Sequence, residues 1–143
     1  MEKDLESRRK RALTKFFEEG EFSPEELYNL VERCADFGTL NPKTGDVFIK
    51  KEFKLATKEQ VALVPVVRFL GSRVDEGIEP GATIEEVAKY VTIDEPIARA
   101  RLSDSTRKGL LMRIGTGSYS ARSLATVKKF IEGLENKYKG KER

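Results

Sequence analysis

Basic side chains gather in the carboxy-terminal part of this sequence, and such side chains can bind the phosphates of a polyanion. Residues 1–80 carry 14 lysines and arginines against 16 acidic residues, whereas residues 81–143 carry 13 against 8. Positive charge concentrated in one segment favours binding of a nucleic acid. The contrast is sharpest between residues 95 and 122, where six basic residues, Arg99, Arg101, Arg107, Lys108, Arg113 and Arg122, accompany two acidic ones, Glu95 and Asp104.

The sequence offers few residues for other chemistry. It has no histidine and a single cysteine, Cys34, so it lacks histidine-based nucleophiles, histidine zinc sites and an internal disulfide. Its paired glutamates fall mostly at expected helix starts, where they complement the helix dipole. The stretch Gly115-Thr116-Gly117 lacks the Gly-Lys-Ser/Thr ending of a phosphate-binding loop. We therefore expect no enzyme activity, no cofactor and no metal.

The elements that would position the basic segment begin with a short helix. Thr83 and Glu86 form a capping box, so a helix should begin near Ile84. Its apolar residues recur at helical spacing and predict one buried stripe: Ile84, Val87, Ala88 and Val91. We expect three polar residues of this helix to face water: Glu85, Glu86 and Lys89.

A second helix should follow the turn formed by residues 92–94. Asp94 is placed to cap it, Pro96 suits its first turn, and Gly109 can end it in the left-handed conformation. Three small or apolar residues share its inner face: Ala98, Leu102 and Ser105.

Two short strands with a glycine turn come next. Residues 110–114 and 119–122 predict the strands, and residues 115–118 predict the tight turn between them. The whole order from Gly81 to Arg122 resembles the winged helix-turn-helix superfamily. The resemblance is carried by the capped helix at residues 84–90, the Ile93-Asp94 turn, the Ala98 and Leu102 face, and residues 109–119 through the wing.

In that superfamily the second helix usually enters the DNA major groove, and the wing lies along the backbone or in the minor groove. The resemblance therefore implies a recognition helix at about residues 95–108 and a basic wing at about residues 110–122. The groove-facing candidates are Arg99, Ala100, Ser103 and Thr106. The candidates for wing contacts are Arg113, Thr116, Ser118 and Arg122.

The residue types suit binding of duplex DNA. Arg99 can donate two hydrogen bonds to guanine O6 and N7, and the short side chains of Ser103 and Thr106 can reach base edges or phosphates. Four further residues would neutralise phosphates: Arg107, Lys108, Arg113 and Arg122. Neutralisation of about five phosphates predicts a slope of about −4.5 for log affinity against log salt.

Two other interpretations remain open. The basic side chains could simply be solvated, with Glu95 and Asp104 pairing at i, i+4 with Arg99 and Lys108. Alternatively, the winged helix could serve as a protein interaction module or an assembly subunit that binds no nucleic acid.

Residues 1–78 predict a helical lobe with a short hairpin. We expect a first helix at residues 5–19 and a second that is capped by Ser23, has Pro24 in its first turn and stops at Gly38. Turn-forming residues 41–46 separate the two strands of a hairpin, Thr39-Leu40 and Val47-Phe48-Ile49. The alternation of Phe53 and Leu55 with charged residues suggests that the second strand continues to Leu55.

A third helix, at residues 58–73, should form the hub of the core because it is apolar nearly all round. Thr57 is expected to cap it, and Pro65 should kink it. Residues 75–81 then form a connector to the second domain, residues 79–143.

Ser123 should cap a last helix at about residues 124–138, with a stripe formed by Leu124, Val127, Ile131 and Leu134. The rest of the chain or a second copy must cover this stripe, and the second case would make a homodimer.

The sequence thus predicts a mainly α protein with small β elements: a helical amino-terminal lobe with a hairpin, then a winged helix-turn-helix and a terminal helix. We expect a cytoplasmic protein that binds double-stranded DNA, of the transcriptional-regulator kind. We expect neither a membrane span nor an export signal. Its many charged residues, 36% of the chain, resemble the composition of thermophile proteins.

Overall fold

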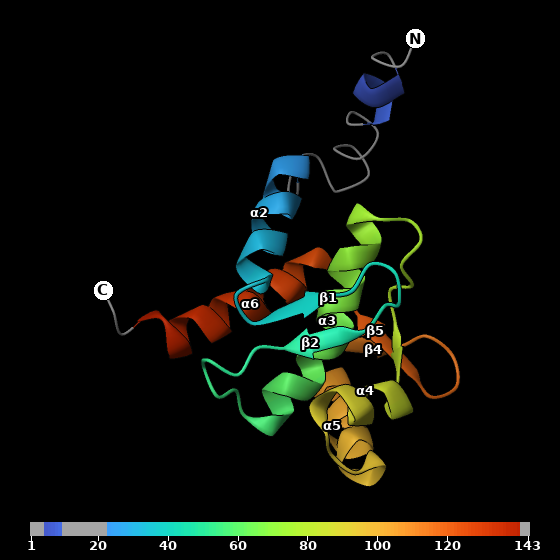
Figure 1. Ribbon diagram of the computed structural model, residues 1–143, viewed down its shortest axis with the longest axis vertical. Helices are drawn as coiled ribbons and strands as arrows, with labels where there is room; N and C mark the ends of the chain where they lie inside the picture. Colours follow the sequence, from blue (N-terminus) through green and yellow to red (C-terminus); the bar gives the residue numbers. More distant parts are fainter. Residues whose placement is uncertain (1–4, 10–22, 141–143) are drawn as a thin grey trace.

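The computed structural model describes residues 5–9 and 23–140, which are mainly helical and include two small antiparallel sheets (Figure 1). From residue 23 the elements are α2 (Pro24–Cys34), β1 (Gly38–Leu40), β2 (Val47–Ile49), α3 (Thr57–Val74), β3 (Ala82–Thr83), α4 (Ile84–Val91), α5 (Glu95–Arg107), β4 (Leu111–Arg113), β5 (Ser118–Ala121) and α6 (Leu124–Tyr138). The predicted fold class is confirmed. Of the first predicted helix, residues 5–9 are helical, and the remainder of its range lies outside the described residues.

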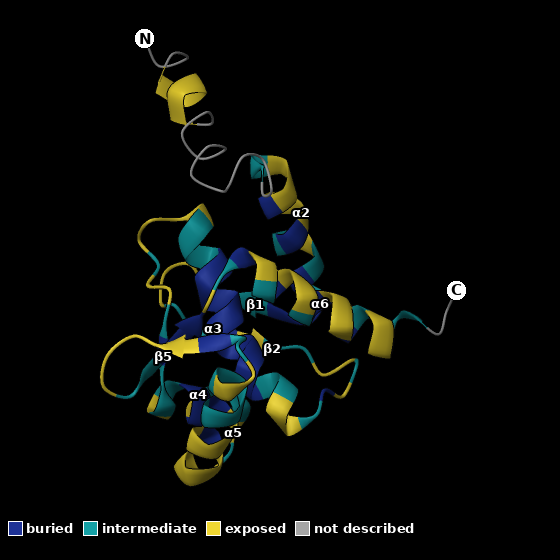
Figure 2. Cartoon of the chain, turned by 180° about the vertical axis from the view of Figure 1, so that it is seen from behind, coloured by how far each residue is buried: buried dark blue, intermediate teal, exposed yellow. Residues whose placement is uncertain are grey.

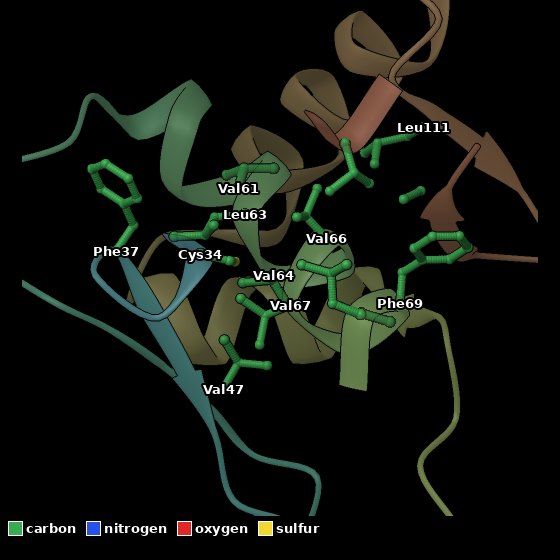
Figure 3. Close-up of a cluster of buried hydrophobic side chains, with 14 of the residues drawn as sticks. Cys34, Phe37, Val47, Val61, Leu63, Val64, Val66, Val67, Phe69 and Leu111 are labelled. Carbon is green, nitrogen blue, oxygen red and sulfur yellow. The ribbon is translucent and has the colours of Figure 1, made fainter. Parts of the chain in front are cut away.

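Helix α3 is the element around which the others pack. Every residue from Val61 to Leu70 is buried, which agrees with a helix that is apolar on all sides. It contacts seven other elements: α2, β1, β2, β3, α4, α5 and β5. Figure 3 shows its side chains meeting Phe37, Val47 and Leu111 from three other parts of the chain.

The beginning of α3 differs from the prediction. The helix starts at Thr57 itself, and Ala56 occupies the N-cap position. Ala56 has no side-chain acceptor; instead Glu59 Oε1 accepts a hydrogen bond from the Ala56 backbone N–H at 2.7 Å. The helix continues through Pro65, and the kink expected there stays a prediction.

The end of α2 also differs. Ser23 caps this helix as predicted, its hydroxyl accepting from the Glu26 N–H at 3.2 Å. The helix stops at Cys34, four residues before Gly38, because the chain turns to bury Phe37 completely. Gly38 instead opens β1, where an added Cβ would lie 3.1 Å from Leu63 Cδ2. Its small size therefore serves the close approach of the hairpin to α3.

Strands β1 and β2 form the predicted hairpin, with Thr39 opposite Phe48. The expected continuation of the second strand to Leu55 is wrong. Residues 50–56 form no strand, and Lys54 adopts the left-handed conformation at a φ of 52°. Leu55 is buried, so its apolar character reflects packing in the core and not a strand pattern.

The carboxy-terminal elements follow the predicted order of helix, turn, helix and hairpin. The second sheet has the order β3-β5-β4, with Ala82 opposite Tyr119 and Arg113 also opposite Tyr119 from the other side. Figure 2 shows buried residues on α3 and the inner sides of its neighbours, and exposed residues on the outer side of α5 and on the loop beside β5.

Helix α6 begins at Leu124 after the Ser123 cap, as predicted, with the Ser123 hydroxyl accepting from the Thr126 N–H at 3.2 Å. Its apolar stripe is buried within this chain, and α6 packs against α2 and β5. Arg33 on α2 reinforces this contact by donating from Nε to Glu135 Oε2 at 3.0 Å. The stripe on which the predicted homodimer rested therefore does not supply a dimer face.

One buried cluster of side chains extends from α2 to α6 and includes residues of both predicted domains. The division into residues 1–78 and 79–143 stays a prediction. In the described part of the chain, no helix has the length and apolar character that crossing a bilayer would require.

Candidate nucleic-acid interface

Helix α5 has a buried face and an exposed face, and the groove-facing candidates divide between the exposed face and its border. Ala98 and Leu102 are completely buried, against α3, α4 and β4. Arg99 and Ala100 are exposed, as are Arg107 and Lys108 near the end of the helix. The remaining candidates, Ser103 and Thr106, are half-buried at the border.

One of the hydroxyl groups is already engaged. Thr106 Oγ1 donates to the Leu102 carbonyl at 2.8 Å, the backbone bond that threonine commonly makes inside a helix. Its proton is therefore used, and in this rotamer Thr106 can only accept a hydrogen bond from a ligand. Ser103 has no such bond among the described residues and keeps both its donor and its acceptor.

The two ends of α5 are determined by different means. Asp94 occupies the N-cap position, but its side chain makes no capping hydrogen bond, and only its carbonyl accepts, from Ala98 N at 3.0 Å. The predicted role of its carboxylate as a cap is therefore wrong, and the carboxylate is exposed. At the other end Gly109 has a φ of +88°, and Leu110 N donates to the Ser105 carbonyl at 3.1 Å. This is the predicted glycine stop.

The hairpin of β4 and β5 forms the predicted wing. Gly115 and Gly117, with φ of +120° and +73°, allow the tight turn, which Ile114 N closes by donating to the Ser118 carbonyl at 3.0 Å. Arg113 and Thr116 are exposed, and Ser118 is half-buried. Strand β4 contacts α5, so the helix and the hairpin lie next to each other.

Arg122 follows β5 and is also exposed. Its backbone N–H donates to the Leu110 carbonyl at 2.9 Å, which positions it beside the end of α5. All ten predicted site residues thus lie on, or directly next to, α5 and the β4–β5 hairpin. Seven of these residues are exposed, and three, Ser103, Thr106 and Ser118, are half-buried.

The ion pairs on α5 differ from those expected if the basic residues were merely solvated. Asp104 pairs with Arg107 and lies 3.8 Å from Arg101, in both cases at a spacing of three residues. Neither expected i, i+4 pair forms. Four basic residues of this region take part in no ion pair within the described part of the chain: Arg99, Lys108, Arg113 and Arg122.

A buried arginine on α3 bonds to α4, the helix that precedes α5. Arg68 on α3 is only 6% exposed and donates to both carboxylate oxygens of Glu86, from Nη1 at 2.9 Å and from Nη2 at 2.8 Å. It also donates to the carbonyls of Gly45 at 3.0 Å and Gly81 at 3.1 Å. One guanidinium therefore joins the hairpin loop, the connector before β3 and helix α4.

The network continues through a tyrosine. Arg68 Nη2 donates to Tyr90 Oη at 3.0 Å, and Tyr90 donates in turn to Asp46 Oδ1 at 2.9 Å. Burial and the bond to Asp46 raise the pKa of Tyr90 above its ordinary value, so the phenol stays protonated as a donor. Burial alone would raise the pKa of Glu86, but the hydrogen bonds from Arg68 and Thr83 outweigh it and lower that pKa.

Sequence reasoning missed this network. It assigned Glu86 to water, whereas the structure places its carboxylate on Arg68, half-buried, while it also completes the predicted capping box by accepting from Thr83 N at 3.0 Å. The available signal was the arginine within residues 61–70 of α3, a stretch whose other residues are all apolar, because a buried arginine is rare unless it is paired.

Within the described residues no group of three or more acidic or cysteine side chains is placed to hold a metal ion. Cys34 is buried, and burial raises the pKa of its thiol to about 12. Comparison of this chain with protein families, with curated protein sequences and with solved structures found no match.

Proposed function

We propose that this chain is a DNA-binding protein of the winged helix-turn-helix kind and acts as a transcriptional regulator. In this proposal α5 enters the major groove, and the β4–β5 hairpin lies along the phosphate backbone. We also propose that the protein acts in the cytoplasm, the compartment expected from the sequence.

The observation that supports the proposal most strongly is the state of the basic side chains. Arg33, Arg68, Lys137 and Lys139 each pair with a carboxylate from a distant part of the chain. Arg99 on α5, Lys108 just after it, Arg113 on β4 and Arg122 just after β5 are exposed, belong to no ion pair within the described residues and are gathered on two adjoining elements. Unpaired cations on a projecting helix and hairpin suit the phosphates of a duplex.

The pair between Arg107 and Asp104 does not oppose the proposal. The Arg107 side chain is 77% exposed, and exposed ion pairs contribute at most about 1 kcal/mol, so a phosphate can replace Asp104 as its partner. With Arg107, Lys108, Arg113 and Arg122 on phosphates, these contacts would contribute a slope of about −3.6 to log affinity against log salt.

The test is fluorescence anisotropy of a labelled random-sequence duplex across a salt series. The double variant Arg99→Ala/Arg113→Ala should bind this duplex more weakly and with a salt slope smaller in magnitude by about 0.9, because the phosphate contact of Arg113 and the positive charge of Arg99 in the groove are both removed. The matched control is Lys128→Ala/Lys129→Ala, which removes the same charge from exposed positions on α6. Equal binding by the two variants would refute the proposed interface.

A second candidate function is binding of a partner protein through the same region. Its support is the exposure of three large apolar side chains there: Ile97 at 45%, Met112 at 37% and Ile114 at 40%. Absence of duplex binding at low salt, with the folded protein confirmed by circular dichroism, would favour this function over DNA binding.

A further inference from the structure

The loop between β2 and α3 presents three lysines, Lys50, Lys51 and Lys54, beside the helix-turn-helix. Lys51 and Lys54 are exposed and Lys50 is half-buried. None of the three takes part in an ion pair within the described residues, and the only acidic residue between them is Glu52. This basic loop, residues 50–54, was not among the binding residues expected from the sequence.

The backbone of the basic loop is held firmly at several points. Lys50 N donates to the Phe37 carbonyl at 2.9 Å, and the ring of Phe53 lies 5.1 Å from that of Phe37. Immediately after the loop, Leu55 is buried, and its carbonyl accepts from Gln60 Nε2 at 2.8 Å. These contacts reduce the conformational entropy that the loop would lose on binding a ligand.

The backbone of Lys54 adopts a strained conformation within this loop. Its φ of 52° lies in the left-handed region, which disfavours a residue other than glycine by about 1–2 kcal/mol. Strain of this kind persists only where the surrounding structure imposes it, and it concentrates at functional positions. Here it accompanies a turn that leaves Lys51 and Lys54 exposed.

The basic loop adjoins the helix-turn-helix directly. A cavity of about 450 Å³ is lined by its three lysines together with Tyr90, Val91 and Thr92, the residues at the end of α4 that lead into α5. Figure 1 shows the loop between β2 and α3 on one side of α4 and α5, and the β4–β5 hairpin on the other. Figure 2 shows the same order from behind.

We infer that the basic loop is a third DNA-contacting element, in which Lys51 and Lys54 bind backbone phosphates on the side of α5 opposite the hairpin. The inference rests on the proposed function. The duplex would then be held on both sides of the groove that α5 enters. Because lysine acts as a point charge on phosphate, the loop would add affinity and fix orientation without reading sequence.

The two lysines would add about 1.8 to the magnitude of the salt slope, taking it from about −3.6 to about −5.4. The variant Lys51→Gln/Lys54→Gln should therefore return the slope to about −3.6. Between 50 and 200 mM salt the native chain would lose about 1,800-fold in affinity, and this variant about 150-fold. Sequence preference should be the same in both.

The control is Lys128→Gln/Lys129→Gln, which removes two exposed lysines from α6 and should keep the native slope. If Lys51→Gln/Lys54→Gln had the same salt slope of log affinity as the native chain, the inference would be overturned. The proposed function would still stand in that case, provided that Arg99→Ala/Arg113→Ala binds the duplex more weakly than the native chain. No duplex binding by the native chain would overturn both.

A second measurement avoids variants altogether. Lysines of the native protein are acetylated with and without saturating duplex, and the modification is quantified by mass spectrometry. We expect the duplex to protect Lys51 and Lys54 at least five-fold while Lys128 and Lys129 react as before. If each of the four lysines were acetylated to the same extent with and without the duplex, the inference would be contradicted.

Discussion

Replacement of Arg68 by methionine should destabilise the protein more than loss of an ordinary surface ion pair. The guanidinium is nearly inaccessible and forms five hydrogen bonds, two of them to the carboxylate of Glu86. Methionine fills much of the same volume but leaves that carboxylate and the carbonyls of Gly45 and Gly81 without this donor. Removing one partner of a buried pair generally costs about 3–5 kcal/mol.

The lower end of that range applies here. The Glu86 side chain is 35% exposed, so water can reach part of the carboxylate, and Thr83 N still donates to it. We expect a loss of about 3 kcal/mol in the free energy of unfolding, which is about 10 °C in Tm for a chain of this size. Urea denaturation followed by circular dichroism measures it, with the midpoint expected to fall at constant m.

Two further variants separate charge from packing. Arg68→Lys keeps the positive charge but loses the planar set of five N–H donors of the guanidinium. The free energy of unfolding of this variant should therefore lie between those of the native chain and Arg68→Met. In Arg68→Met/Glu86→Leu the unpaired carboxylate is gone, and the double variant should recover about half of the loss.

The dependence on pH gives an independent check. In the native chain the pKa of Glu86 is lowered, so its contribution to stability is present above the pKa of the unfolded chain, near 4.3, and is lost as pH falls through the folded value. Without Arg68, burial would instead raise that pKa, and acid would relieve the unpaired charge. The difference in the free energy of unfolding between the native chain and Arg68→Met should therefore become smaller from pH 7 to pH 4. A loss below about 0.5 kcal/mol, or one independent of pH, would refute the reasoning.

Three other changes test local features. Thr92, a β-branched residue at a φ of 63°, should be replaceable by glycine with a gain of about 0.5–1 kcal/mol in urea denaturation, and a loss would contradict the strain assigned there. Gly109→Ala should cost about 1–2 kcal/mol; nothing lies within 4 Å of the added Cβ, so a neutral result would mean that the φ of +88° carries no penalty. Cys34, whose thiol pKa is raised to about 12, should resist iodoacetamide at pH 8 until urea unfolds the chain, and rapid labelling of the folded protein would show that the thiol is accessible.

Several features that depend on residues within one turn of each other could be predicted from the sequence, although the side-chain caps expected from Thr57 and Asp94 do not form. The caps at Ser23, Thr83 and Ser123 and the stop at Gly109 are confirmed, because each is made by hydrogen bonds between neighbours three to five residues apart. The hairpin turn after Asn41 belongs to the same class, since its side chain accepts from Lys43 N at 2.9 Å.

The candidate site could be predicted in part for the same reason. Because the positions of α4, α5 and the hairpin follow from local signals, the exposed side of α5 could be deduced from the spacing of Ala98 and Leu102. The ion pairs of Asp104 could not, because pairings at three and four residues differ too little in energy for spacing to distinguish them. The function of these residues stays a proposal.

Only the tertiary structure decided the features that join distant residues. The alternation of Phe53 and Leu55 with charged residues suggested a strand. In the structure Leu55 belongs to the buried core and Phe53 packs against it, while Lys54 between them adopts a left-handed backbone conformation. The apolar stripe of α6 required a cover, and α2 supplies it from about 100 residues earlier in the sequence, through contacts such as Arg33 with Glu135. An apolar stripe indicates that burial of that helix face is favourable. It does not specify which element covers the face, because the hydrophobic effect is non-directional. The same limit applies to Arg68, whose need for acceptors is evident in the sequence, whereas the identity of Glu86, Gly45 and Gly81 depends on how α3 meets the elements packed around it.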